Sequence, residues 1–447
     1  MVLPGYSYGT RFFGMDDANS WVPGPKFVFG GGQKPITIHL PQNPSRGIVV
    51  PEFINEVIAN NWLDTTRSIY TPFTTVLTES FSIHTTLEPI PDLKIDLTAT
   101  HTTSKTTSEY IHDSLVPGQP KPYTVIDGYT EGGSFSMSYF MLGTLFEGNT
   151  AGDLNLFYQY LDNRIIISRR LGLNSGTTVI PHTGYYDGYS AVSQNVVIPA
   201  FLAAYSGRSA GNIPLTAFPS IPFPNWTISY SGLSKLIPWV KNNTQSVTIS
   251  SAYTSSYSVG SFNYNLLYNP DGEWVRDINN DFIPQDQIPT VALTEQFSPL
   301  IKIGVTLKSN IMSNIEVRTD RQVALNMSDL SVNEVHGQEY IAGLGYKIKN
   351  LQLPIKIGNK PLKNDLTIKL DLSLRENQTI LRNTENLSSQ ITGGQSILSI
   401  KSQAEYNINQ RVSVRLFFDK VINTPFISSS YPTSTMDGGI AIRFTLS

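Results

Sequence analysis

The sequence contains no cysteine, which excludes disulfide bonds, thiol catalysis and every metal site that needs a cysteine ligand. Charged residues are also scarce, at 15% of the chain, and the formal net charge is −3. Because no block of like charge stands out, the sequence indicates neither a nucleic-acid-binding surface nor a polybasic membrane tether. Ser, Thr, Asn, Gly and Tyr are abundant instead, a mixture that suits strands with one wet face.

Long apolar runs are missing as well. No segment approaches the roughly eighteen apolar residues that a membrane-spanning helix needs. The first six residues also lack the basic and apolar regions of a secretory signal peptide. If the chain reaches an outer membrane, we therefore expect it to be processed or to be one part of a longer protein.

What the sequence does contain is regular alternation of apolar and polar residues, seen most clearly over residues 365–374. Side chains of a strand point alternately to opposite faces, so one face of this segment is wholly apolar and the other is polar. The same pattern returns over residues 93–99, 412–418 and 440–446.

About thirteen such segments are predicted as strands, most of them longer than the five or six residues usual in soluble sheets. Their length matches the nine to eleven residues of a tilted membrane strand. We therefore predict an all-β fold: a transmembrane antiparallel β-barrel, or the C-terminal arc of a very large one. The predicted strands cover residues 74–88, 92–110, 132–145, 225–231, 245–268 (one long strand or two), 288–297, 300–308, 311–328, 338–349, 364–376, 394–408, 410–422 and 438–446.

The strands divide the chain into four parts. Residues 1–73 form a Gly- and aromatic-rich loop followed by a short helix, and residues 74–145 form the first barrel strands. Residues 146–224 are a partly helical insert rich in Gly, Pro and aromatics, which we interpret as a cap or plug; the alternative is a self-packed loop. Residues 225–447 form the remaining strands, ending in a closing strand.

The alternation also predicts which side chains face lipid and which line a wet interior. Charged residues on the lipid side would cost a few kcal/mol each near the membrane midplane, so we place them in the channel. The predicted channel-lining residues are Lys369, Asp371, Arg411, Arg415 and Arg443. The predicted lipid-facing residues are Leu366, Ile368, Leu370, Leu372, Leu374, Val412, Val414, Leu416, Phe418, Ile440, Ile442, Phe444 and Leu446.

One weak metal candidate is present. Asp277, Asn279 and Asp281 occupy the first three ligand positions of a calcium loop, but the positions that need glycine and glutamate hold Phe282 and Ile288. An ordinary Asx-rich turn explains these residues more simply. The six histidines are scattered, no Gly-x-Ser-x-Gly element is present, and we predict neither catalysis nor a cofactor.

Several aromatic residues are candidates for contacts that close the lumen or bind a partner. So many aromatics in loop-like sequence imply that the loops pack against something. These residues are Phe12, Phe13, Trp21, Phe27, Phe29 and Trp226.

Six stretches, spread over nearly the whole chain, resemble one protein family. They are LPGYSYGTRFFGMDD (3–17), FGGG (29–32), LEPIPDLKIDLTAT (87–100), NWTISYSGLSKL (225–236), AYTSSYSVGSFN (252–263) and EQFSPLI (295–301). Together they resemble the C-terminal part of the SprA (Sov) family, the outer-membrane translocon of the type IX secretion system of Bacteroidetes, which is related to gliding motility. Members of that family are several times longer than this chain.

The resemblance implies a protein-conducting channel for folded secreted proteins. It also implies partners: a smaller barrel of the PorV type at a lateral opening, a periplasmic plug protein, the secreted cargo, membrane lipid and the N-terminal remainder of the translocon. Two other classes stay open. A self-contained porin or transporter would close with this chain alone, and a soluble β-sandwich adhesin would bury its apolar faces in protein.

Overall fold

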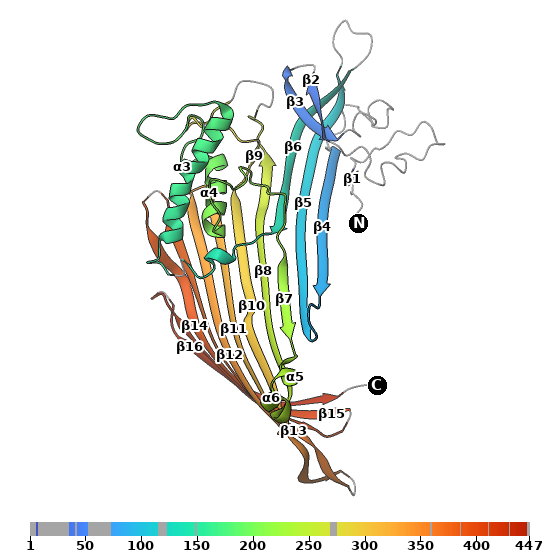
Figure 1. The fold of residues 1–447 in the computed structure, drawn as a ribbon. Helices are drawn as coiled ribbons and strands as arrows, with labels where there is room; N and C mark the ends of the chain where they lie inside the picture. Colours follow the sequence, from blue (N-terminus) through green and yellow to red (C-terminus); the bar gives the residue numbers. More distant parts are fainter. Residues whose placement is uncertain are drawn as a thin grey trace, which may run out of the picture.

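The fold is dominated by one large antiparallel sheet, and a group of helices lies against one of its faces near one end (Figure 1). This sheet has fourteen strands within the described part of the chain, and a separate two-stranded sheet is formed by β2 and β3. The predicted all-β antiparallel fold is confirmed. The computed structural model describes residues 6–7, 35–40, 43–51, 73–114, 123–147, 150–268, 275–357, 360–384, 386–409, 411–428 and 430–444.

From β4 to β16 the strands follow one another in sequence order across the sheet and pair antiparallel with their neighbours, except that β7 shares the line of β6 between β5 and β8, and β9 pairs with β8 alone. Their bounds are β1 Tyr6–Ser7, β2 Pro35–Leu40, β3 Asn43–Pro51, β4 Phe73–Leu87, β5 Leu93–Ser114, β6 Tyr123–Ser138, β7 Asn225–Tyr230, β8 Thr244–Tyr264, β9 Asp286–Gln287, β10 Thr290–Leu307, β11 Ile311–Asn326, β12 Ser331–Ile357, β13 Lys360–Asn383, β14 Ser389–Asn407, β15 Val412–Pro425 and β16 Thr433–Phe444. The helical elements are η1 Leu142–Thr144, α3 Asn155–Ser175, α4 Gln194–Ser206, α5 Leu233–Leu236 and α6 Pro238–Asn243.

The sheet is open within the described residues. At one side, β4 pairs with β5 and with the two-residue strand β1. At the other side, β16 pairs with β15 alone. The strands in between form an uninterrupted ladder, so the described residues make an arc of wall.

Two strand predictions need correction. The segments 288–297 and 300–308 form one strand, β10, because its pairing with both neighbours resumes after a bulge at residues 298–300 that includes Pro299. The strand predicted over residues 132–145 ends at Ser138, and Leu145 lies in a turn after η1.

The reason β6 ends early is that another strand continues its path. Both β6 and β7 pair with β5 on one side and with β8 on the other, β6 against residues 256–263 of β8 and β7 against residues 249–253. The backbone N–H of Phe223 also donates to the carbonyl of Ser138. Residues 139–224 are therefore an insert that interrupts a single line of the sheet partway along the wall.

The insert contains the two longest helices of the described residues. α4 is apolar on all sides and buried, as expected for a helix enclosed by other elements. It packs against α3, and its buried side chains share one hydrophobic cluster with Tyr257 of β8, Leu293 of β10 and Val323 of β11. Both helices end at glycines in the left-handed region, Gly176 and Gly207, which accept this backbone conformation without strain.

The two ends of the wall differ in their connections. One end has short turns, at residues 88–92 and 308–310, and the small helices α5 and α6 (Figure 1). The other end, beside α3 and α4, carries longer connections, which lead from β8 to β10 and from β15 to β16. Short turns at one end and long loops at the other are typical of outer-membrane barrels. In the described ranges, no helix is both long and apolar enough to cross a membrane.

Candidate functional site

One face of the wall has two tiers. β11 and β12 pair without a register shift from Ile311 to Leu325, so every second residue of β11 points to the same side. Val323 and Leu325 on this side are buried under the insert. Ile315 and Val317 therefore face the same way, farther along the strand and beyond the insert.

The uncovered tier is a band of exposed apolar side chains. Leu370 is 39% exposed, and Leu344, its partner on β12, is 57% exposed. On β13 the band runs from Leu366 to Leu374, about 26 Å at roughly 3.3 Å per residue, which fits the ~25 Å apolar band of outer-membrane barrels. The exposed polar residues Gln338 and Glu376 mark its upper limit.

The predicted lipid-facing residues of β13, β15 and β16 all lie on this band. Leu370 is paired with Ser402 of β14, and Ser402 is paired with Phe418 of β15, so the three residues lie in one row across the sheet. Val414 is paired with Ile442 of β16. Ile440 and Phe444 are exposed to more than half of their maximum. Leu446 lies outside the described residues. A large exposed apolar surface of this kind is rare on soluble proteins and is typical of a wall that faces hydrocarbon.

The opposite face of the wall is polar, and its charges are paired across strands. Glu316 of β11 lies between Lys302 at 3.0 Å and Arg318 at 2.5 Å. Arg318 also contacts Glu339 of β12 at 3.4 Å. Arg375 of β13 pairs with Asp320 at 3.0 Å, and Lys347 pairs with Asp365 at 2.9 Å. These alternating charges leave little net charge on the face.

Four of the five predicted channel-lining residues share this polar face. Lys369 and Asp371 lie on the same side of β13 as Arg375, and the register places Asp371 opposite Lys401. Arg415 lies opposite Glu405, and Arg443 opposite Ser413. Arg411 precedes β15 and lies in the turn after β14.

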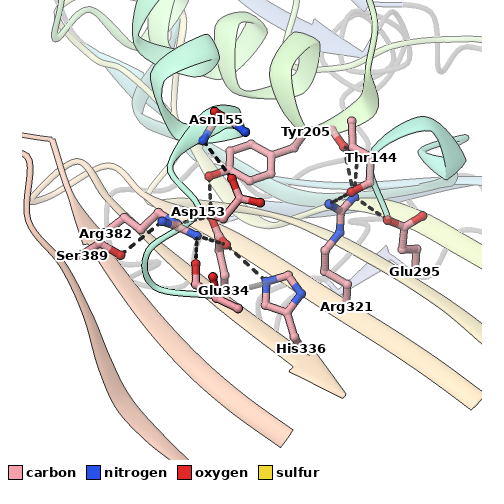
Figure 2. Close-up of polar contacts among 11 residues, drawn as sticks. Thr144, Asp153, Asn155, Tyr205, Glu295, Arg321, Glu334, His336, Arg382 and Ser389 are labelled. Atoms are coloured by element: carbon pink, nitrogen blue, oxygen red, sulfur yellow. Dashed lines mark hydrogen bonds and ion pairs between the residues drawn. The ribbon is translucent and has the colours of Figure 1, made fainter. Parts of the chain in front are cut away.

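Two buried ion pairs, each between neighbouring strands of the wall, hold the insert through hydrogen bonds (Figure 2). In the first, Arg321 of β11 pairs with Glu295 of β10, directly opposite in the register. The guanidinium also donates to the carbonyl and hydroxyl of Thr144, at 2.6 and 2.8 Å, and to the carbonyl of Tyr205 at 3.2 Å. A charge on the wall thus satisfies three acceptors of the insert.

In the second pair, Arg382 of β13 binds Glu334 of β12 through two nitrogens, at 2.8 and 3.1 Å. The hydroxyl of Tyr205 donates to the same carboxylate at 2.5 Å (Figure 2). Arg382 also donates to the carbonyl of Thr150 at 3.2 Å. Burial raises the pKa of the Tyr205 hydroxyl, with the nearby Glu334 carboxylate adding to the effect, so Tyr205 stays a donor. Tyr205 links both ion pairs to α4.

Sequence reasoning missed these four charged residues, although a signal was present. Glu295 follows Val291 and Leu293 at the apolar positions of its strand, and Arg321 precedes Val323 and Leu325 in the same way. A charge inside an apolar series costs several kcal/mol when buried alone, so it signals a buried partner.

The insert lies on the face that carries the apolar band, not on the polar face. This placement follows from the shared register of Arg321 with Val317 and of Glu334 with Tyr340. A plug for a polar lumen belongs on the other side of the wall. The arrangement favours a role for residues 139–224 as a cap on the wall's outer flank.

The calcium candidate forms a turn that is satisfied by the protein itself. The Asp277 carboxylate accepts the backbone N–H groups of Asn279 and Asp281, each at 2.9 Å. The buried Asp281 carboxylate accepts both the N–H and the hydroxyl of Ser190 at 2.6 Å, and burial raises its pKa. Within the described ranges, no cluster of three or more His, Asp or Glu side chains is placed to hold a metal ion.

The aromatic contact candidates are only partly described. Phe12, Phe13, Trp21, Phe27 and Phe29 lie outside the described residues. Trp226 of β7 stacks on Tyr253 of β8 at 4.4 Å between ring centroids and meets the Phe297 ring edge-on. It packs within the wall's own aromatic cluster, where β7 takes over from β6.

A prediction about pH follows from Asp286, which lies in β9 against the insert. Burial raises its pKa to about 6, with Glu131 adding to the rise, and its Oδ1 atom has no partner within the described residues. Because the folded-state pKa exceeds the ordinary 3.8, its stabilisation is complete below pH 3.8 and is lost as pH rises through about 6. We expect the unfolding free energy of the region around Asp286 to fall by about 1–2 kcal/mol between pH 4 and 7, less than the whole shift would give, because the carboxyl group is partly exposed to solvent.

Chemical denaturation at several pH values, followed by hydrogen exchange of α4 amides, measures this fall. The Asp286→Asn variant should be more stable at pH 7 and should lose the dependence. An unchanged pH slope in that variant would show that another group is responsible.

Comparison with known protein families and with curated proteins finds no match. Among solved structures, OmpT of Vibrio cholerae, an outer membrane protein, is similar over 83% of this chain and 99% of its own, with 8% identity and a TM-score of 0.20. A likeness this weak carries no argument, and the description of the fold rests on the sheet itself.

Proposed function

We propose that the chain is a wall segment of a protein-conducting outer-membrane channel that passes folded secreted proteins, a part of the type IX translocon that the SprA (Sov) resemblance implies. The observation that carries the proposal is the open arc. Strands of membrane-spanning length end, within the described residues, at β4 and β16 without closing on each other. Unpaired backbone groups cost several kcal/mol each in lipid, so further strands must complete the wall.

The arc also favours this function over the two alternatives. A self-contained porin would pair β4 with β16, and these strands are not partners in the described structure. A soluble adhesin would bury the face that carries Leu370 and Leu372, and both are about 40% exposed. A wide barrel needs more strands than this arc provides, and the N-terminal remainder of the translocon would supply them.

The polar face suits a passive conduit. Its charges are neutralised in pairs such as Arg375 with Asp320, so the wall offers no strong site for cargo of either sign. Selectivity then comes from pore width and from partners: a smaller PorV-type barrel at a lateral opening and a periplasmic plug protein. The chain performs no reaction of its own, and the driving force comes from elsewhere.

Cross-linking in living cells tests the proposal. A photo-reactive residue at position 373, on the polar face, should form adducts with secreted proteins, whereas one at position 372, on the apolar band, should not. Depletion of the chain should leave those proteins in the periplasm. A chain that sits in the outer membrane yet gives no protein adduct at 373, and whose depletion spares secretion, would contradict the proposal.

A further inference from the structure

The connection between β7 and β8 carries exposed apolar side chains at the short-turn end of the wall, where α5 and α6 lie (Figure 1). Leu236 of α5 is 69% exposed, Ile237 is 44% exposed and Trp239 of α6 is 68% exposed. The three residues lie within four positions of the chain, so they gather apolar surface at one place. An exposed tryptophan beside exposed aliphatic residues is typical of a membrane–water interface.

This connection is held to the wall at both of its ends. At its start, the backbone N–H of Ser231 donates to the carbonyl of Asp92 at 3.0 Å, and the Lys235 ammonium pairs with the Asp92 carboxylate at 2.6 Å. At its end, the backbone N–H of Lys308 donates to the carbonyl of Asn243 at 3.0 Å. The exposed apolar side chains are therefore presented at a fixed place on the wall.

That place adjoins the apolar band. Ile303 of β10 pairs with Ile315 of β11, which lies on the band. Two residues further along β10 and on the same side, Val305 pairs with Val247 of β8. β8 begins at Thr244, directly after α6. The connection thus continues the apolar surface at the end with the short turns, which is the periplasmic end in outer-membrane barrels.

Basic side chains accompany this apolar surface. Lys241 of α6 is exposed, and so is Lys308, whose backbone bonds to the last residue of α6. Neither ammonium group makes a hydrogen bond or an ion pair within the described part of the chain. Residues 231–243 contain two lysines and no acidic residue. Apolar residues with tryptophan and lysine in a short helical segment suit the surface of an anionic membrane.

We propose that α5 and α6 form an interfacial anchor in the inner leaflet of the outer membrane, the leaflet that consists of phospholipids. Leu236, Ile237 and Trp239 insert among the lipids beneath the headgroups. The ammonium groups of Lys241 and Lys308 bind the phosphate oxygens of anionic phospholipids. The anchor fixes the depth at which the wall sits in the membrane. This inference rests on the membrane placement of the wall in the proposed function.

A nitroxide spin label at position 239, attached through Trp239→Cys, tests the insertion in the chain purified with its outer-membrane assembly and placed in nanodiscs. We expect this label to be more accessible to molecular oxygen, which concentrates in lipid, than to a water-soluble nickel chelate. A control label at position 373, on the polar face, should show the reverse order. A label at position 372, on the apolar band, reports the membrane placement of the wall itself.

Native mass spectrometry tests the charges in nanodiscs that contain phosphatidylglycerol and phosphatidylcholine. A double variant with Lys241→Gln and Lys308→Gln should retain phosphatidylglycerol about tenfold more weakly, because each basic residue near an anionic surface adds to the attraction. The charge-matched control combines Lys94→Gln with Lys302→Gln, because both of these lysines pair with carboxylates on the polar face. The control should retain phosphatidylglycerol as the unaltered chain does.

The outcomes are distinct. The anchor is overturned, and the channel proposal left standing, by a label at 239 that responds to the nickel chelate as the label at 373 does. A label at 239 that a protein partner shields from both reagents, or an equal loss of phosphatidylglycerol in the two double variants, has the same consequence. A label at 372 that reports water would overturn both proposals.

Discussion

Replacing Arg321 with methionine is expected to detach the insert from the wall, with a loss of about 3–5 kcal/mol. The change leaves the Glu295 carboxylate buried without its partner and removes three hydrogen bonds to Thr144 and Tyr205. Residues 139–224 should become sensitive to protease, and the amides of α4 should exchange faster. Limited proteolysis and hydrogen exchange measure both effects.

Two further variants test whether the unpaired buried charge of Glu295 causes the expected loss of stability. Arg318→Met breaks ion pairs on the opposite, wetter face, where the side chain is 38% exposed, and should cost less than about 1 kcal/mol. Adding Glu295→Gln to Arg321→Met should restore part of the protection, because it removes the orphaned charge. The account of the anchor fails if Arg321→Met is as protease-resistant as Arg318→Met.

Placing an arginine in the apolar band is the second change with a large expected effect. Leu372→Arg should destabilise the membrane-inserted wall by about 2–4 kcal/mol, because a guanidinium near the bilayer midplane is poorly solvated. Its neighbour Ser373 points to the polar face, so Ser373→Arg should change stability by less than about 0.5 kcal/mol.

Urea titration of the assembly in lipid vesicles compares the two variants, and the amount of each in the outer membrane supports the result. Equal costs at positions 372 and 373 would mean that the two faces of β13 do not differ in environment. A larger cost at 373 would place lipid on the polar side.

The strands were the predictable part of the fold. Strict alternation over residues 365–374 specifies one apolar and one polar face, and the apolar set appears together on the exposed band. Strand ends were harder to predict, because pairing extends into polar segments. β12 begins at Ser331, although the apolar pattern indicates a start near residue 338.

The attachment of the insert could not be predicted from a local pattern. The apolar segment 196–204 is compatible with a strand or a buried helix, and only its contacts with the wall settle it as α4. The continuation of β6 by β7 depends on pairing across an insert, which no periodicity reports. The calcium candidate shows the opposite case, since the Asx-rich turn that the sequence offered as an alternative is the structure observed.

The most direct test of the central claim is a cysteine scan of residues 366–374 in intact cells, which the absence of native cysteine makes clean. A water-soluble thiol reagent should label positions 367, 369, 371 and 373 and leave 366, 368, 370, 372 and 374 unlabelled until detergent or denaturant is added. Equal labelling of both sets in the membrane would contradict the account, because the apolar band would then face water.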